Sequence, residues 1–288
     1  MLKKICIIPA YDRPEYLYLC LEKIVETNEY HDIKIIVSLD LNYNPNNLDV
    51  IDKFNNILNI TLSSNNINVS NKEMKQSFHL LSAYKKYYNM HKPDLIYMIE
   101  DDIIISKDFF SFHEDIHKLY SNTFVSIVSE PNNFKGLPGS NNDIYHSPMS
   151  DYQSLGVCFN ANKLNEFILC HNVSEYYKNP NHYLLNKFPN SKYNNKWWEQ
   201  DGMIRRVLES LNVTPIYACT PRCYHAGYYG YHRPGNRPNG TLNEKINELR
   251  NIIFNQELLN SKQEVYKDSF ICNLNTSHDK LNLIKYES

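Results

Sequence analysis

Long apolar runs and long runs of like charge are both missing from this sequence. No apolar stretch approaches the ~18 residues that a membrane-spanning helix needs, so no span is predicted. The net charge is only -2, and no block of like charges stands out. Bulk electrostatics therefore favour neither nucleic acid nor an anionic membrane surface as a partner. No internal repeat and no low-complexity segment is visible either.

Cysteine is sparse and unpatterned. The seven cysteines are scattered along the chain, odd in number, and contain no CxxC pair. This distribution argues against a disulfide framework and against a structural zinc site. The first residues, Met1 to Lys4, lead directly into an apolar stretch that is too short for the core of a signal peptide. These observations favour a soluble protein with a cytoplasmic location.

Predicted strands alternate with predicted helices through the first ~130 residues. Short apolar runs predict strands over residues 3–11, 32–40, 59–64, 94–99 and 123–129. Helical periodicity occurs over residues 14–27, 46–57, 72–90 and 106–120, with Ser106 expected as the N-cap of the last of these helices. This alternation predicts an α/β fold with a mainly parallel sheet flanked by helices on both faces.

The second half of the sequence is more irregular. Residues 131–152 are rich in Gly, Pro, Asn and Ser and predict a long loop. Beyond it, the pattern predicts a strand and a helix over 154–170, a helix over 197–212, a strand over 213–221, a loop over 222–240 and a helix over 241–259. No clear linker is visible, so we expect one domain with an elaborated second half.

Three adjacent carboxylates, Glu100 to Asp102, follow the apolar run at 94–99. In parallel sheets, ligands bind at the carboxyl ends of the strands, where Arg13 and Asp40 are also expected. Burying three unpaired carboxylates would cost several kcal/mol, so they need a cation, a hydrogen-bond network or water. A hard divalent ion takes carboxylate oxygens and completes its shell with water and phosphate. The strand context favours such an ion, bridging protein and a diphosphate, over a solvated acidic turn.

The segment MIEDDIIISKDFFSFHEDI, residues 98–116, resembles the acidic-motif segment of GT-A glycosyltransferases. It is most similar to the type I N-acetylglucosaminyltransferase family, inverting enzymes that move GlcNAc from UDP-GlcNAc. Other segments that resemble this family follow in the same order: PAYDRPEYLYLCLEKI, IIVSLD, YQSLGVCFNANKL, WWEQDGMIRR and PRCYHAGYYGY. The resemblance covers roughly residues 3 to 235, and it implies a GT-A fold with an irregular acceptor-side second half.

The resemblance implies a metal site and a donor site. Asp102 matches the acid that ligates the metal, expected to be Mn²⁺ with Mg²⁺ as a substitute, and His225 matches a further ligand, with His232 as the alternative. The residues expected to bind the donor are Arg13, Asp40, Glu100, Asp101, Leu155 and Gly156. Gly156 is the position where the backbone would come close to the donor sugar.

The resemblance also implies a catalytic base on the segment WWEQDGMIRR. Asp201 is the best match for this base, and Glu199 is the alternative, because the family has two adjacent acids where Gln200 separates them here. An inverting transfer needs one carboxylate to take the proton of the attacking acceptor hydroxyl. Trp197 and Trp198 precede these acids and are candidates either for a wall against a sugar ring or for the core.

Together these observations predict a metal-dependent inverting glycosyltransferase that moves a sugar, GlcNAc first, from a UDP-sugar to a glycan or glycoconjugate. The expected single domain spans residues 1–259, with a nucleotide-binding half at 1–130 and an acceptor and catalytic half at 131–259, followed by a tail at 260–288. Three alternatives stay open: a retaining GT-A transferase, a metal-dependent nucleotidyl or phosphoryl transferase, and a glycan-binding module without activity.

Overall fold

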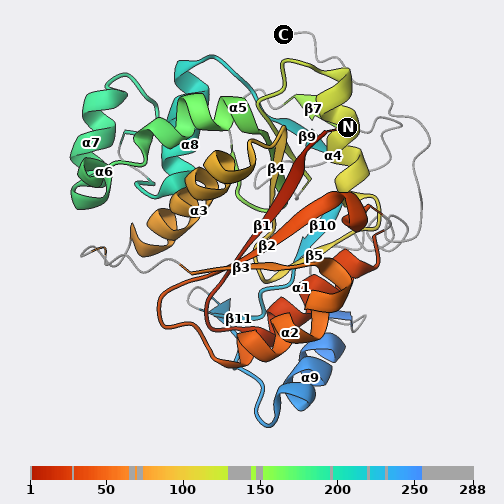
Figure 1. The fold of residues 1–288 in the computed structure, drawn as a ribbon. Helices are drawn as coiled ribbons and strands as arrows, with labels where there is room; N and C mark the ends of the chain where they lie inside the picture. Colours follow the sequence, from red (N-terminus) through yellow and green to blue (C-terminus); the bar gives the residue numbers. More distant parts are fainter. Residues whose placement is uncertain are drawn as a thin grey trace.

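The chain folds around one eight-stranded sheet (Figure 1). The structure, a computed structural model, describes residues 2–27, 29–64, 69, 74–128, 144–146, 152–194, 197–218, 221–230 and 233–254. The strands of the sheet, in spatial order, are β3 (Thr61–Ser64), β2 (Ile33–Leu39), β1 (Lys4–Ala10), β4 (Leu95–Met98), β8 (Val157–Asn160), β6 (Val125–Ile127), β9 (Ile216–Ala218) and β7 (Ile144–His146). Two short ladders stand apart from it: β5 (Ile103–Ile105) with β10 (Cys223–His225), and β11 (Tyr229–Gly230) with β12 (Arg233–Pro234).

Helices connect most of these strands. The α-helices are α1 (Pro14–Val25), α2 (Asn46–Leu58), α3 (Lys75–His91), α4 (Phe109–Leu119), α5 (Ala161–Lys163), α6 (Ser174–Lys178), α7 (Pro180–Lys187), α8 (Gln200–Ser210) and α9 (Leu242–Phe254). Among the residues that the structure describes, there are also a π-helical turn, η3 (Leu164–Ile168), and two 3₁₀ turns, η1 (Tyr30–Asp32) and η4 (Leu169–His171). Of the helices that the structure describes, none is long and apolar enough to span a bilayer.

The composition of β1 shows why helices are needed on both sides of the sheet. Five of the seven residues of β1 are buried. Ile5 and Ile7 belong to one hydrophobic cluster, and Cys6 and Ile8 belong to another. Because successive side chains of a strand point to opposite faces, both faces of β1 carry apolar surface that must be covered.

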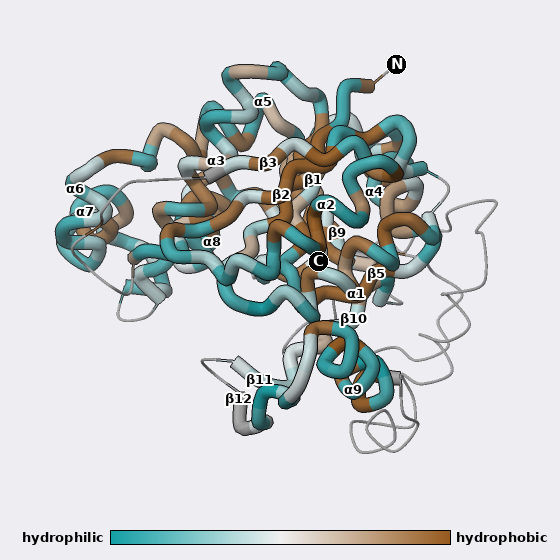
Figure 2. The backbone as a smooth tube through the Cα atoms, turned by 60° about the horizontal axis from the view of Figure 1, so that its bottom comes forward, coloured by the Kyte–Doolittle hydropathy of each residue, from teal (hydrophilic) through white to brown (hydrophobic). Residues whose placement is uncertain are grey.

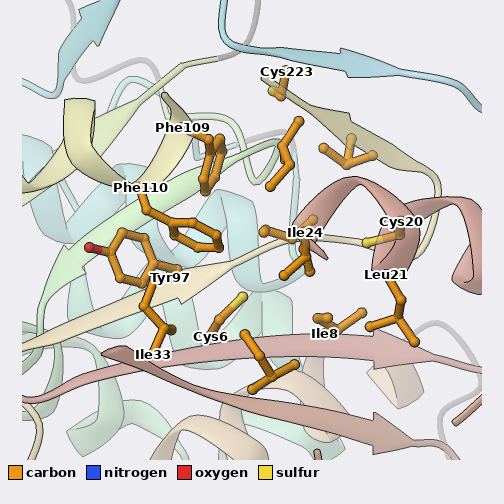
Figure 3. Close-up of a cluster of buried hydrophobic side chains, with 14 of the residues drawn as sticks. Cys6, Ile8, Cys20, Leu21, Ile24, Ile33, Tyr97, Phe109, Phe110 and Cys223 are labelled. Carbon is orange, nitrogen blue, oxygen red and sulfur yellow. The ribbon is translucent and has the colours of Figure 1, made fainter. Parts of the chain in front are cut away.

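Two groups of helices provide this cover (Figure 1). On one face, α3 and α8 contribute residues such as Tyr84 and Ile204 to the first cluster. On the other face, α1 and α4 contribute residues such as Leu21 and Phe110 to the second cluster, which Figure 3 shows at close range. Figure 2 shows the hydrophobic colour concentrated along the central strands β1 and β2. The sheet is therefore the middle layer of three.

The predicted α/β class is confirmed. Strands β3, β2, β1 and β4 are parallel throughout, and β6 and β9 are parallel as well. Antiparallel pairs in this sheet, β4 with β8, β8 with β6, and β9 with β7, all involve a strand of the second half. The second half is thus the more irregular part, as the sequence indicates. The predicted boundary at residue 130 stays a prediction, and the sheet extends across it.

Ser106 is not the N-cap of α4. The helix begins at Phe109, and Asp108 occupies the cap position without a side-chain capping bond. The Asp108 carboxylate instead accepts a hydrogen bond from the Ser106 hydroxyl at 2.6 Å and one from Nε of the buried Arg222 at 3.2 Å. An ion pair with Arg222 therefore takes the place of a local capping bond. Arg222 is distant in the sequence, so the residues near α4 could not reveal this partner.

Several predicted boundaries in the second half are wrong. The loop predicted over 131–152 contains β7, although 131–143 and 147–151 lie outside the described residues. The helix expected within 154–170 is present as one continuous helical segment, in which α5 passes into η3 and then into η4. Helices α6 and α7 were not expected, and the loop predicted over 222–240 contains β10, β11 and β12. The tail at 260–288 lies outside the described residues.

A histidine on α4 makes the stability of the fold sensitive to acid. His117 lies against the sheet, with Nε2 at 3.3 Å from the carbonyl of Cys158 and 3.2 Å from the hydroxyl of Ser126. Burial lowers the pKa of His117 from 6.5 to about 4. Below pH 6.5 the unfolded chain therefore binds a proton that the folded chain excludes, so stability is lost as the pH falls towards 4.

We expect the His117→Gln variant to lack this pH dependence. The free energy of unfolding of the wild type should fall by about 1–2 kcal/mol relative to the variant between pH 7 and pH 5. Urea denaturation of both proteins at pH 7 and at pH 5 measures the two free energies of unfolding. Contributions from other titrating groups are the same in both proteins and cancel in the difference. Leu119→Ala, an exposed change on the same helix, is the matched control without a titratable group. A constant difference between wild type and His117→Gln would contradict the prediction.

Candidate active site

Charged residues follow β2, β1 and β4, three strands that are neighbours in the sheet. Arg13 follows β1, Asp40 follows β2, and Glu100 to Asp102 follow β4. The three strands are parallel and in register, so their carboxyl ends lie side by side. The chain thus brings three sequence-predicted groups to the edge where α/β sheets bind ligands.

Arg13 holds two of the three acids. Its guanidinium forms a two-pronged contact with Asp101, through Nη2 to Oδ1 and through Nε to Oδ2 at 3.4 Å. Its Nη1 donates to Oδ2 of Asp102 at 2.6 Å. Burial disfavours the charge of Arg13, but Asp101 and Asp102 hold its pKa above the usual value. The cation therefore persists and keeps two buried carboxylates close together.

The two acids that share Arg13 have opposite pKa shifts. Burial raises the pKa of Asp101 to about 6, with Arg13 opposing this rise. Burial also disfavours the charge of Asp102, but hydrogen bonding from His225 and the charge of Arg13 outweigh it and lower the pKa of Asp102 to about 2. Asp102 is therefore a carboxylate at any physiological pH, which a metal ligand must be.

Backbone register brings His225 to Asp102. In the antiparallel ladder of β5 and β10, His225 lies opposite Ile103, which is the residue after Asp102. The N–H of Ala226 donates to the carbonyl of Asp102 at 2.8 Å. As a result, Nε2 of His225 stands 3.3 Å from Oδ2 of Asp102. The family resemblance implies that both residues are metal ligands; the structure places them in contact, and the ligand role stays a prediction.

Gly227 keeps this contact open. A Cβ built on Gly227 would stand 2.9 Å from Oδ2 of Asp102 and 2.9 Å from Nε2 of His225. Any side chain at this position would crowd the two groups. The other oxygen of Asp102, Oδ1, is buried and has no hydrogen-bond partner among the described residues. A buried carboxylate oxygen without a partner has capacity for a ligand.

Glu100 and Asp201 converge on one hydroxyl. The Oγ of Ser154 lies 3.3 Å from Oε1 of Glu100 and 3.2 Å from Oδ2 of Asp201. Asp201 lies in the first turn of α8, and Nε2 of Gln200 donates to its other oxygen at 3.3 Å. Segments that are distant in the sequence thus place two carboxylates beside the edge that carries Asp102.

The pKa values of these two carboxylates are both raised. Burial raises the pKa of Glu100 to about 8, and the negative charges of Asp102, Asp201 and Asp101 add to this rise. Burial raises the pKa of Asp201 to about 6, and the positive charge of Arg205 opposes the shift. At neutral pH Asp201 is therefore ionised and can accept a proton. A pKa just below the working pH suits a general base.

Glu199 does not share this environment. Glu199 is exposed at the N-cap of α8. Its backbone carbonyl accepts a hydrogen bond from the N–H of Met203 at 3.0 Å. Of the two acids that the sequence offers as a base, only Asp201 meets Glu100 through Ser154. The geometry therefore favours Asp201. The other candidate histidine, His232, lies outside the described residues.

Asp40 reaches the same edge but is two strands from the acidic residues. Its Oδ1 accepts the N–H of Leu41 at 2.6 Å and lies 3.8 Å from Nδ1 of His79. His79 is buried on α3, its Nε2 is 2.9 Å from the carbonyl of Ser38, and burial lowers its pKa. Within the described residues, no contact joins Asp40 to Asp101 or Asp102. Its role in donor binding stays a prediction.

Leu155 and Gly156 lie between Ser154 and β8. Gly156 has φ +62°, and a Cβ there would come within 2.5 Å of Sγ of Cys223 and 3.2 Å of Cγ2 of Val128. Glycine is thus required by both backbone conformation and packing. Backbone conformation and packing alone therefore explain why residue 156 is glycine. The close approach of its backbone to a donor sugar stays a prediction.

Sequence reasoning missed Ser154 and Gly227, although both lie in segments quoted for the resemblance. Ser154 precedes Leu155 directly, and Gly227 follows His225 by two residues. Glycine near a candidate metal ligand is a usable signal, because such a ligand needs open space beside it. For Ser154 no local signal exists, since its partners come from other segments.

The described residues of the site could supply only some of the ligands that a metal ion needs. Among the residues that the structure describes, no three His, Cys, Asp or Glu side chains are placed to hold a metal ion by themselves. Asp102 and His225 offer two donors, and the unpartnered Oδ1 of Asp102 offers a third atom. This set fits an ion that takes its remaining ligands from water and a phosphorylated substrate.

No family model matches the chain, and no curated protein matches it. Solved structures with a similar fold include S. aureus TarS 1-349 in complex with UDP-GlcNAc, at 16% identity over 95% of this chain and 72% of that one, with a TM-score of 0.49. The WbbM bifunctional glycosyltransferase has 12% identity over 90% of this chain and 51% of that one, with a TM-score of 0.45.

A third similar structure is the mannosyltransferase PcManGT from Pyrobaculum calidifontis in complex with GDP-Man and Mn²⁺. Its identity is 11% over 57% of this chain and 46% of that one, and its TM-score is 0.43. This chain therefore spans about half the length of PcManGT and of WbbM. Similarities at this level decide nothing about chemistry, which rests on the residues of the chain itself.

Proposed function

We propose that this protein is a GT-A-type, metal-dependent, inverting glycosyltransferase. It moves a sugar, with GlcNAc as the first candidate, from a UDP-sugar to a hydroxyl of a glycan or glycoconjugate. The observation that carries this proposal is the convergence of Glu100 and Asp201 on Ser154, at the sheet edge where Asp102 meets His225. An ionisable base and a candidate cation site on one edge are the two parts that such a transfer requires.

Asp102 and His225 are the residues that would hold a divalent cation, Mn²⁺ or Mg²⁺. When bound, the ion would supply Lewis-acid stabilisation of charge on the departing diphosphate. Arg13 adds a permanent positive charge at the same edge, since its pKa stays high beside Asp101 and Asp102. Three nitrogens of Arg13 already donate to Asp101 and Asp102, so Arg13 would contact the donor through its remaining N–H groups, and Glu100 would hydrogen-bond to the donor sugar.

Asp201 performs the proton transfer in this proposal. The acceptor oxygen forms a bond to the anomeric carbon while its proton passes to the Asp201 carboxylate. The bond between that carbon and the β-phosphate oxygen breaks, and UDP leaves with the electron pair. Attack from the side opposite to UDP inverts the anomeric configuration. A single ionised carboxylate on the acceptor side is sufficient for this route.

Product analysis separates the alternatives. A retaining transferase gives the opposite anomer, which NMR of the product distinguishes. A nucleotidyl or phosphoryl transferase does not release intact UDP together with a transferred sugar. A glycan-binding module binds sugar and turns over nothing. The raised pKa of Asp201, which keeps a base near neutrality, favours an enzyme over a binding module.

We expect UDP and UDP-sugars to stabilise the protein only when a divalent cation is present. A ligand that binds only the folded state raises the melting temperature by mass action. The measurement is thermal unfolding with a panel of UDP-sugars in Mn²⁺, in Mg²⁺ and in EDTA, followed by calorimetric titration of UDP. Equal affinity for UDP with and without EDTA would remove the cation from the proposal, and no stabilisation by any UDP compound would contradict the donor class.

A further inference from the structure

The two tryptophans of the chain have different surroundings. The ring of Trp198 is partly buried, lies 5.2 Å from the guanidinium carbon of Arg206, and its backbone carbonyl accepts the hydroxyl of Tyr176 at 2.8 Å. Trp198 thus has a packing role. Trp197 is 46% exposed, which is unusual for so large an apolar side chain beside a candidate active site.

The backbone holds Trp197 in a disfavoured conformation. Its φ is +52°, a left-handed value that costs a bulky residue roughly 1–2 kcal/mol. Its carbonyl accepts from Nη1 of Arg206 at 2.9 Å, and the same nitrogen donates to the carbonyl of Gly202 at 2.9 Å. A Cβ on Gly202 would stand 1.7 Å from the Trp197 carbonyl oxygen. Strain that the surrounding structure maintains in this way is typical of functional sites.

The indole itself is also held in place. The guanidinium carbon of Arg205 lies 4.3 Å from the centre of the Trp197 ring, a cation–π distance, and Nε of Arg205 donates to the carbonyl of Tyr152 at 2.8 Å. The ring of Tyr193 lies 5.8 Å away, at an angle of 47°. The exposed indole is therefore oriented before any ligand binds, which reduces the entropy lost on binding.

Trp197 and the proposed base occupy the same end of α8. Asp201 and Arg205 are four residues apart on this helix, so they share one of its faces. Arg205 contacts the Trp197 ring, and the Trp197 carbonyl contacts the turn at Gly202. An exposed, fixed aromatic surface thus lies next to the residue that would receive the acceptor proton.

We propose that Trp197 is a binding platform for the acceptor, on which a pyranose ring stacks through its C–H face. This inference rests on the proposed transferase function. Indole offers a broad apolar surface that matches the apolar face of a sugar ring, and it keeps this surface in contact with solvent. The platform would set the affinity for the acceptor, while Asp201 would set the rate of proton removal.

Kinetics of Trp197→Ala test the proposal. The probes are UDP-GlcNAc as donor, or whichever UDP-sugar the wild type uses, with the β-methyl glycosides of glucose, galactose, N-acetylglucosamine and mannose as acceptors. We expect the KM for the acceptor to rise about tenfold, the kcat to stay within about twofold, and the Kd of the UDP-sugar to stay unchanged. Trp197→Phe should recover part of the loss. Leu211→Ala, an exposed apolar change just after α8, is the matched control.

Fluorescence gives a readout that does not depend on turnover. The chain has two tryptophans, so Trp198→Phe leaves Trp197 as the only indole, and Trp197→Phe leaves Trp198. With UDP and Mn²⁺ present, the acceptor glycoside should shift the emission of Trp197 saturably, and it should leave that of Trp198 unchanged. If Trp198→Phe does not fold, the emission of the wild type, which has both tryptophans, is compared with that of Trp197→Phe. The acceptor should then shift the emission of the wild type only.

The outcomes separate this inference from the proposed function. An unchanged acceptor KM in Trp197→Ala, in an enzyme that transfers sugar normally, overturns the platform and leaves the transferase intact. A parallel fall of kcat and donor affinity would show that Trp197 supports the fold of the site, and it would also overturn the platform. A wild type that neither binds nor turns over any UDP-sugar overturns the proposed function, and this inference with it.

Discussion

Asp201→Asn should bind the UDP-sugar normally and lose transfer. The amide matches the carboxylate in size and can keep a hydrogen bond with Ser154, but it cannot accept the proton of the acceptor hydroxyl. General-base catalysis is worth about 10²–10⁴-fold, so we expect kcat to fall by at least about 100-fold. The Kd for the donor should change little, because the base acts on the acceptor. Steady-state transfer and calorimetric titration of the donor measure the two quantities.

Glu199→Gln identifies which acid is the base. Glu199 is exposed and lies two residues before Asp201, so the two variants test neighbouring carboxylates with different surroundings. If Glu199→Gln loses transfer and Asp201→Asn keeps it, Glu199 is the base and the contact of Asp201 with Ser154 is structural. If both variants transfer normally, the inverting mechanism that we propose has no base at this site.

The second large effect is expected at Asp102. Asp102→Ala should lose cation-dependent UDP binding, with the affinity for UDP in Mn²⁺ falling by at least about 100-fold, since even outer-shell changes cost 10–100-fold at metal sites. The protein should still fold, because Arg13 keeps its two-pronged contact with Asp101 and no buried charge is left unpaired. Titration of UDP in Mn²⁺ and in EDTA, with circular dichroism as a check on folding, measures the effect.

Asp12→Asn is the matched control for Asp102→Ala. Asp12 precedes Arg13 in the loop after β1 and also pairs with an arginine, Nη1 of Arg237 at 3.2 Å, but it is exposed and lies outside the acidic cluster. We expect it to bind UDP as the wild type does. A folded Asp102→Ala protein with unchanged UDP affinity in Mn²⁺ would show that the cation binds elsewhere or not at all.

Local periodicity predicts the first half of the fold well. The run at 3–11 becomes β1, and the pattern at 14–27 becomes α1, each within two residues of the expected ends. These elements are long and bury regular faces, so the local signal agrees with the tertiary structure. β5 and β10 are missed because each has only three residues, and each is a strand only through its pairing with the other.

The candidate site is predicted in part, for a similar reason. The acids after β4 and Arg13 after β1 follow from the position of strand ends, and Asp102 and His225 do meet. The hydroxyl that joins Glu100 to Asp201 could not be predicted, because nothing near Ser154 in the sequence marks it as facing other carboxylates. The same limit applies to Trp197 and Trp198, which are adjacent and identical in type but differ in burial.

The pairing of β5 with β10 also affects how the protein is made. Asp102 and His225 are 123 residues apart, so a ribosome adding about 5–20 residues per second needs roughly 6–25 s to synthesise the histidine after the acid. During this interval the nascent chain already contains Arg13, and helices α1 to α4 form from local contacts that fold quickly. Arg13 is therefore available to pair with Asp101 and Asp102 before His225 has been synthesised. A translation pause or a chain break within this interval would leave a first half of the chain in which Asp102 lacks its contact with His225.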